Sequence, residues 1–248
     1  MSRKIKVSAV SYLNTKPLLY GIERHPVREQ MILDVAYPAL IAERLKNDST
    51  DIGLVSTAAL LSIPNARIIA DYGIAASGPV ASVCIYSMVP IEQLKGIYLD
   101  YQSRTSVRLA EILLKKYWQL DIQLLPAPEN FIDLINEQTG AVIIGDRALQ
   151  ANSRFPYVYD LSEHWKAFTG LDFVFAAWIA NKDIPQDFMD AFNTANALGV
   201  AHIDEVIKEQ VVDFYDMNHY FKQNIKYHLD ESKREGLELF LKYLREDF

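Results

Sequence analysis

Residues 4–18 read KIKVSAVSYLNTKPL, which places a strand, a polar turn and a helix start in direct succession. The apolar alternation of residues 4–10 predicts a first β-strand. Pro17 suits the first turn of a helix, where the N–H that it lacks would have had no partner. The N–H groups and the positive dipole end of that helix then face whatever lies beyond the strand. Capping by Asn14 or Thr15 is the simpler explanation of the polar residues.

Strand-like and helix-like segments continue to alternate outward from this unit, which is typical of an α/β fold with largely parallel sheets. Further strands are predicted at residues 31–36, 51–55, 66–71, 80–87, 96–100, 121–125, 141–144 and 173–180. Helices are predicted at residues 38–46, 103–118 and 129–136 and, after Pro185, over almost all of the chain to residues 230–246.

The number of strand–helix cycles indicates two lobes. One cycle precedes Ser87, a second ends near Gly170, and helices follow the next strand. This order suits two lobes joined by two crossing segments, with the C-terminal helices packed back on the first lobe. A single doubly wound sheet is the competing interpretation, and periodicity alone does not exclude it. The predicted lobes are residues 1–88 with 178–248, and residues 89–177.

The composition excludes several classes of protein. Half of the 248 residues are hydrophobic and 23% are charged, which predicts a packed core and not a disordered chain. The net charge of −7, with Lys and Arg dispersed, argues against a nucleic-acid partner. The single cysteine, Cys84, excludes an internal disulfide and a multi-cysteine metal site. Because Cys84 lies in an apolar run, we predict a buried, unreactive thiol.

Targeting and cofactor signals are not found in the sequence. No apolar stretch approaches the roughly 18 residues of a membrane span, and the N-terminus lacks the apolar segment of a secretory signal. We therefore expect a cytoplasmic protein with no membrane partner. The histidines lack metal-ligand spacing, and no nucleotide-binding or serine-hydrolase motif is found. We expect no bound metal and no organic cofactor.

Three more strand-to-helix turns carry polar residues. The sequence SRTS at residues 103–106 places three hydroxyls and a guanidinium at one helix start, more donors than a cap requires. Ser-Thr at residues 56–57 and Gly-Asp at residues 145–146 are similar turns. Each is explained equally well by ordinary capping. Together with the first turn they predict a cleft that binds a carboxylate, because ligands of α/β folds lie beyond the carboxyl ends of the strands.

Two further features border this predicted cleft. Ser77 and Ser82 flank a Gly-Pro pair and could supply donors where the chain crosses between lobes, although a plain turn explains the Gly-Pro pair as well. Aromatic residues are concentrated around Thr169 and Gly170. Core packing is the default role of such rings, and some of them could form the wall for an unsaturated ring.

Several segments resemble a known family. They are SAVSYLNTKPL (8–18), DIGLVSTAALL (51–61), SGPVASV (77–83), SRTSVRLAEILL (103–114), GDRAL (145–149) and HWKAFTGLDFVFAAW (164–178). In this order, from about Lys4 to Lys182, they look like the chorismate dehydratase family of the futalosine route to menaquinone. The resemblance implies a Venus-flytrap fold related to type II periplasmic binding proteins, with the ligand between two lobes. It also implies loss of water from chorismate, giving 3-[(1-carboxyvinyl)oxy]benzoate, without metal or organic cofactor.

The resemblance also implies individual site residues. Asn14 matches the catalytic asparagine of the family. No general base stands out in the motifs; Asp146 is one candidate, and the substrate's own side-chain carboxylate is another. The substrate-binding positions that the resemblance implies are Ser56, Ser82, Arg104, Thr105, Ser106, Thr169 and Gly170.

Two other classes of function remain open at this point. A non-catalytic binding protein for a small carboxylate metabolite would share the fold and the helix-terminus site. A ligand-sensing domain of a regulator is a third class, although the sequence has no helix-turn-helix segment or basic arm. The expected partner is the small molecule chorismate, and a homodimer is considered as the assembly.

Overall fold

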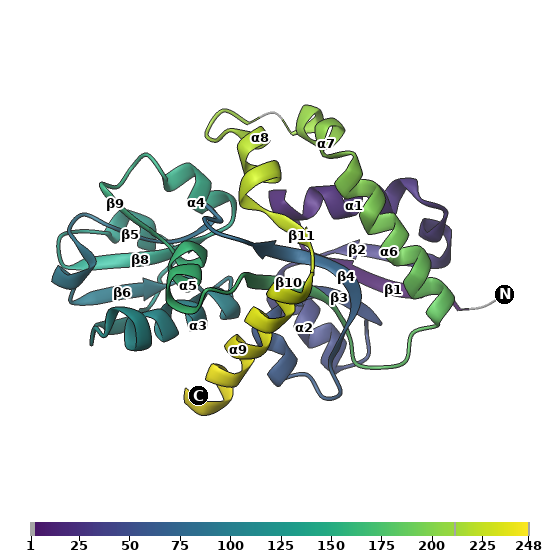
Figure 1. The fold of residues 1–248 in the computed structure, drawn as a ribbon, viewed down its shortest axis with the longest axis horizontal. Coiled ribbons are helices and arrows are strands. Elements are labelled where there is room, and N and C mark those ends of the chain that lie inside the picture. The colour runs from purple at the N-terminus through teal and green to yellow at the C-terminus, as the bar shows by residue number, and fades with distance from the viewer. Residues whose placement is uncertain (1–2, 211, 248) are drawn as a thin grey trace.

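The computed structural model describes residues 3–210 and 212–247, which form two β-sheets, each flanked by helices (Figure 1). The first sheet contains β1 (Ile5–Ala9), β2 (Met31–Val35), β3 (Ile52–Ser56), β4 (Arg67–Ala76), β10 (Phe173–Ala180) and β11 (Lys226–His228). The second contains β5 (Val83–Ser87), β6 (Gly96–Leu99), β7 (Gln123–Pro126), β8 (Thr139–Ile144) and β9 (Tyr157–Asp160). Their strand orders are β11-β4-β10-β3-β1-β2 and β7-β6-β8-β5-β9.

Helices cover both sheets. The α-helices are α1 (Lys16–Arg24), α2 (Pro38–Lys46), α3 (Arg104–Ile112), α4 (Asp146–Ala151), α5 (Leu161–Thr169), α6 (Gln186–Ala201), α7 (Ile203–Glu209), α8 (Met217–His219) and α9 (Glu231–Asp247). Short 3₁₀ helices are η1 (Leu13–Thr15), η2 (Pro26–Gln30), η3 (Thr57–Leu61), η4 (Ile91–Gln93) and η6 (Phe131–Leu134), and π-helical turns are η5 (Leu113–Trp118) and η7 (Tyr220–Asn224). Within the described chain, no helix is long and apolar enough to cross a lipid bilayer.

The two-lobed α/β architecture is confirmed, and the alternative of a single doubly wound sheet is wrong. The two sheets lie at opposite sides of the molecule in Figure 1 and share no strand. In the first lobe α6 packs against α1 and β4. The last helix, α9, contacts β10 and also α3 of the second lobe.

The sheets are mixed, so the expectation of largely parallel sheets is wrong. β1 is parallel to β2 and β3, and β6 is parallel to β7 and β8. β10 is antiparallel to β3 and β4, and β5 is antiparallel to β8 and β9. The reason is topological: β5 and β10 each enter their sheet from the other lobe, so each runs against the strands of the local strand–helix units.

The chain crosses between the sheets at residues 77–82 and 170–172. The pairing of β5 with β8 and of β10 with β3 puts these crossings a few residues before the predicted boundaries at 88/89 and 177/178. The two crossings are tied together, because the Ser77 hydroxyl donates to the Asp172 carboxylate at 2.7 Å. Ala81 has a left-handed φ of 61°, and its N–H donates to the Asp160 carboxylate at 2.6 Å. Both contacts fix how the lobes are joined.

Some element boundaries differ from the predicted ones. The predicted loop at residues 72–79 is mostly strand, because β4 extends to Ala76 between β10 and β11. Instead of a helix at residues 129–136 there is the short 3₁₀ helix η6, and β11 interrupts the predicted C-terminal helices. The segments at 38–46 and 173–180 match α2 and β10. The Cys84 thiol is buried as predicted, and burial raises its pKa.

Candidate functional site

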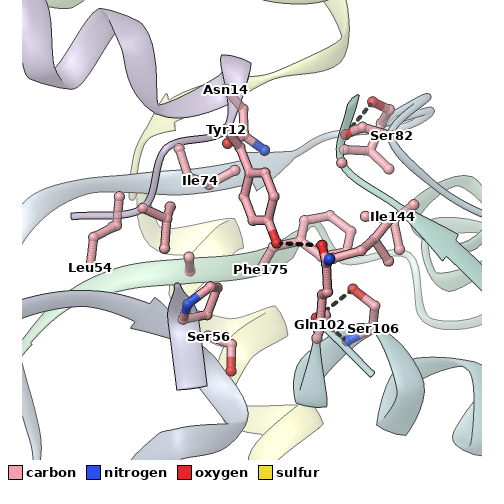
Figure 2. Close-up of a pocket in the computed structure, with 17 residues that line it drawn as sticks. Tyr12, Asn14, Leu54, Ser56, Ile74, Ser82, Gln102, Ser106, Ile144 and Phe175 are labelled. Carbon is pink, nitrogen blue, oxygen red and sulfur yellow. Dashed lines mark hydrogen bonds between the residues drawn. The ribbon is translucent and has the colours of Figure 1, made fainter. Parts of the chain in front are cut away.

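A cavity lies between the two lobes, at the carboxyl ends of β1, β3 and β8 (Figure 2). Its empty space, including the opening to solvent, is about 590 Å³. Apolar lining comes from Val10, Pro38, Leu54, Ile74, Val80, Val83, Ile144, Phe175 and Ala176, with Gly145 beside them. Polar groups come from Tyr12, Asn14, Ser56, Ser82, Gln102, Ser103 and Ser106. Among these described lining residues, none is Lys, Arg, His, Asp or Glu.

Asn14 lies in the short helix η1, which connects β1 to α1. Its side chain is half-buried and extends from the first lobe toward the cavity (Figure 2). The Thr15 hydroxyl donates to the Asn14 amide oxygen at 3.4 Å, a long and therefore weak hydrogen bond. The turn itself is closed by the Thr15 N–H, which donates to the Tyr12 carbonyl at 3.0 Å. Tyr12 and Asn14 of this turn thus reach the cavity, and no side chain caps η1 or α1.

The start of α3 faces the cavity from the second lobe. Ser103 caps the helix, and its hydroxyl oxygen accepts from the Ser106 N–H at 3.1 Å. The Ser103 hydroxyl also donates to the Ser106 hydroxyl at 2.9 Å, which leaves the Ser106 hydroxyl proton available to a ligand. Both residues line the cavity at the positive end of the helix dipole. This is a favourable position for an anionic group.

Two hydrogen bonds join the lobes near the cavity. The Tyr12 hydroxyl donates to the Gln102 side-chain oxygen at 3.1 Å (Figure 2), and the Leu13 N–H donates to the Asp146 carboxylate at 3.2 Å. Burial, together with the charge of Asp100, raises the pKa of Tyr12 to about 12, so this hydroxyl keeps its proton. Gly145 has a left-handed φ of 64°, and a Cβ there would lie 3.3 Å from the Tyr12 ring. A glycine is therefore required beneath this ring.

A partly buried ion pair positions the second-lobe wall. The Asp100 carboxylate accepts from both the Gln102 N–H (3.0 Å) and the Ile144 N–H (3.2 Å), two residues that line the cavity. The Arg147 guanidinium holds Asp100 from the other side with contacts of 2.8 and 2.7 Å. Burial still raises the pKa of Asp100, more than these hydrogen bonds lower it. The pair therefore supports the cavity wall without entering the cavity.

Comparisons with known proteins agree with this geometry. The family model described as menaquinone biosynthesis matches residues 5–246. The chain belongs to this family. A chorismate dehydratase of Thermus thermophilus is 28% identical to this member over 94% of the chain and 92% of the relative, and one of Campylobacter jejuni is 25% identical over 94% of each.

Solved structures similar to this family member show its fold. A protein of Archaeoglobus fulgidus superposes with a TM-score of 0.78 at 14% identity, over 99% of this chain and 98% of that one. The periplasmic aliphatic sulphonate binding protein of Escherichia coli gives a TM-score of 0.61 at 13% identity, over 99% and 93% of the two chains. The expected fold related to periplasmic binding proteins is confirmed.

The structure brings four of the predicted site residues of this family member together. Asn14, Ser56, Ser82 and Ser106 all line the cavity, although they come from different elements. Ser82 is buried at the first crossing, and Ser56 ends β3. Phe175 is the one member of the predicted aromatic group that lines the cavity. The other aromatic residues of that group, such as Trp165 and Trp178, are core residues.

The other predicted positions lie away from the cavity. Thr105 is fully buried, and its hydroxyl oxygen accepts from the Ala58 N–H at 2.9 Å, so it joins α3 to η3. The exposed Arg104 borders grooves on the outside of the helix start. The Thr169 hydroxyl donates to the Trp165 carbonyl at 2.8 Å, and the exposed Gly170 ends α5 with a left-handed φ of 77°. These four residues therefore contact other parts of the protein or solvent, and none of them lines the cavity.

Three polar cavity residues were not among the predicted sites. Tyr12 lies within the motif at residues 8–18, and Gln102 directly precedes the SRTS motif, so these motifs were the available signal. Ser103 belongs to the SRTS motif and caps α3. In the described part of the chain, no cluster of His, Cys, Asp or Glu residues is arranged to hold a metal ion.

Asp146 is placed as a link between the lobes and not as a cavity residue. Its carboxylate accepts the Leu13 N–H, and it does not appear among the lining residues. Burial raises its pKa, more than the Leu13 hydrogen bond and the charge of Lys16 lower it. The geometry therefore favours a role in lobe contact over the role of general base.

Replacing Asp146 with asparagine is expected to flatten the pH dependence of stability. Because burial raises the pKa of Asp146 above 3.8 in the folded protein, the stability that the protonated form provides is complete below 3.8. That stability is lost as the pH rises through the raised pKa. Denaturant unfolding from about pH 4 to about pH 7 should show a larger loss in the wild type than in Asp146→Asn. Equal losses in the two proteins would contradict this assignment.

Proposed function

We propose that this protein dehydrates chorismate to 3-[(1-carboxyvinyl)oxy]benzoate, as the first step of the futalosine route to menaquinone, in the cytoplasm. The observation that carries the proposal is the interlobe cavity, where Asn14 of the first lobe, Ser82 of the crossing and the start of α3 converge. The two named relatives, both chorismate dehydratases, span 94% of this chain and support the substrate.

Neutral donors of the cavity can bind a dianion such as chorismate. Ser103 and Ser106 lie at the positive end of α3, where a carboxylate gains hydrogen bonds and dipole attraction. Apolar side chains such as Phe175 and Ile144 provide flat contact for the ring. Because the described lining has no cationic side chain, binding relies on hydroxyls, amides and the helix start.

The reaction needs orientation more than strong acid or base catalysis. Chorismate loses the C3 proton and the C4 hydroxyl as one water, and the ring becomes aromatic, which provides a large driving force. None of the described lining residues is a carboxylate, histidine or lysine, so we assign removal of the C3 proton to the enolpyruvyl carboxylate of the substrate itself. The carboxylate then passes this proton to the departing C4 hydroxyl, which leaves as water. Asn14 then holds the departing hydroxyl or the ether oxygen in the reactive geometry.

Incubating the purified protein with chorismate tests the proposal. The expected result is a new aromatic product, separated by chromatography, whose mass is that of chorismate less one water. A non-catalytic binding protein of the same fold is the second candidate function, favoured by the structural similarity to a sulphonate binding protein. Saturable binding of chorismate without any product would support that candidate and contradict the dehydratase.

Replacing Gln102 with alanine is expected to weaken substrate retention. The variant loses the acceptor of the Tyr12 hydroxyl, a hydrogen bond between two lining residues from different lobes. One neutral hydrogen bond contributes about 1 kcal/mol, so KM for chorismate should rise about fivefold with a smaller change in kcat. The exposed Gln93 provides the matched control, and Gln93→Ala should behave as the wild type. An unchanged KM in Gln102→Ala would show that the Tyr12–Gln102 hydrogen bond does not help to retain the substrate.

A further inference from the structure

A tyrosine of the C-terminal segment contacts a lining residue of the cavity without lining the cavity itself. Tyr220 lies in the π-helical turn η7, and its side chain is fully buried. Its hydroxyl donates to the Ser82 hydroxyl oxygen at 2.9 Å, and the Asn14 side chain lies near enough to lower the pKa of Tyr220. Ser82 and Asn14 both line the cavity, but Tyr220 itself does not. One hydroxyl therefore contacts Ser82 and lies beside Asn14, two polar side chains that line the cavity.

The protonation of this hydroxyl determines how it orients its neighbours. Burial raises the pKa of Tyr220, more than its hydrogen bonds with Ser82 and Asn14 lower it, so the hydroxyl keeps its proton at neutral pH. Its single proton is directed to the Ser82 oxygen. Its lone pairs are then left to accept, a role that the nearby amide nitrogen of Asn14 can fill. An Asn14 amide oriented in this way keeps its second N–H for a ligand.

The segment that carries Tyr220 is fastened to the first crossing. The Asn224 side-chain amide donates to the Pro79 carbonyl at 2.9 Å, and the Tyr215 hydroxyl donates to the Asn224 side-chain oxygen at 3.4 Å. The Asp216 carboxylate caps the helix before η7 by accepting from the N–H groups of Asn218 and His219. Tyr220 is therefore held rigidly relative to residues 79–82, although it is far from them in the sequence.

We propose that Tyr220 is a positioning residue for the dehydration, which fixes the Asn14 amide and the Ser82 hydroxyl in the orientation that acts on the substrate. This inference rests on the proposed function for its kinetic consequences. It makes the C-terminal segment part of the site, although the segment contributes no lining residue. Tyr220 acts through Asn14 and Ser82 and does not touch the substrate.

Tyr220→Phe tests the inference, because it removes one oxygen and keeps the buried ring. We expect kcat for chorismate to fall about tenfold while KM changes less than about twofold. Tyr227→Phe is the matched control, since Tyr227 is a buried tyrosine of the same segment whose hydroxyl has no partner among the described residues. That control should keep the wild-type kcat. Thermal unfolding of both variants separates positioning from a loss of folded protein.

A double variant and a structure complete the test. Positioning through Ser82 predicts that Tyr220→Phe lowers kcat by a smaller factor in a Ser82→Ala background than in the wild type. A crystal structure of Tyr220→Phe should show the Asn14 or Ser82 side chain in a changed rotamer. Wild-type rotamers, or a wild-type kcat, in Tyr220→Phe would overturn the inference while the proposed function stands. If the wild type does not convert chorismate, the proposed function fails, and the rotamers alone decide the role of Tyr220.

Discussion

Replacing Asn14 with alanine is expected to lower kcat for chorismate dehydration by about 10²–10³-fold, the usual cost of removing one polar group that acts on the reacting atoms. Asn14 is the amide side chain that lines the cavity from the first lobe. Its side chain is half-buried, so the melting temperature should stay close to that of the wild type. Steady-state kinetics with chorismate and thermal unfolding measure the two effects.

An exposed asparagine serves as the control for this substitution. Asn152 lies at the end of α4 on the surface, and Asn152→Ala should keep full activity. Wild-type turnover by Asn14→Ala would remove Asn14 from the mechanism. Loss of folding in Asn14→Ala would instead assign it a structural role.

Replacing Gly199 with alanine is expected to give the largest loss of stability. A Cβ at this position of α6 would lie 1.8 Å from the Pro17 carbonyl oxygen of α1. A Cβ at the facing Gly21 would likewise lie 2.0 Å from the Ala195 carbonyl oxygen. Because the obstacle is backbone, the two helices must separate. We expect a loss of about 3 kcal/mol of unfolding free energy and a fall of about 6–12 °C in melting temperature.

The same substitution should also reduce activity. α1 begins two residues after Asn14, so moving α1 away from α6 displaces the turn that carries the amide. Thr194→Ala, on the exposed side of α6, is the control and should leave stability nearly unchanged. A melting temperature for Gly199→Ala equal to that of the wild type would contradict the close packing of these helices.

Helices and strands were predictable from the sequence where the local pattern of residues favoured one kind of element. Pro38 opens α2, and the continuous apolar run of β10 marks a strand buried on both sides, so these bounds are correct. The extension of β4 and the existence of β11 depend on pairing with strands far away in the sequence, which no local pattern contains. The mixed direction of the sheets likewise follows from how the chain crosses between lobes.

The site could be predicted in part for a similar reason. Turn residues at the ends of β1, β3 and β8 indicated the cavity, because these ends meet in α/β folds. Thr105 is not among the lining residues because neighbours on a helix point about 100° apart, so Ser106 faces the cavity while Thr105 faces η3. The Tyr220 hydroxyl meets Ser82 from 138 positions away, and no spacing rule covers such a distance.

A crystal structure of Asn14→Ala soaked with chorismate tests the central claim most directly, because the slow variant should retain unreacted substrate. The account predicts the ring between the lobes against Phe175, with one carboxylate on Ser103 and Ser106 at the start of α3. Substrate bound outside this cavity, or an empty cavity in a variant whose wild type converts chorismate, would contradict it.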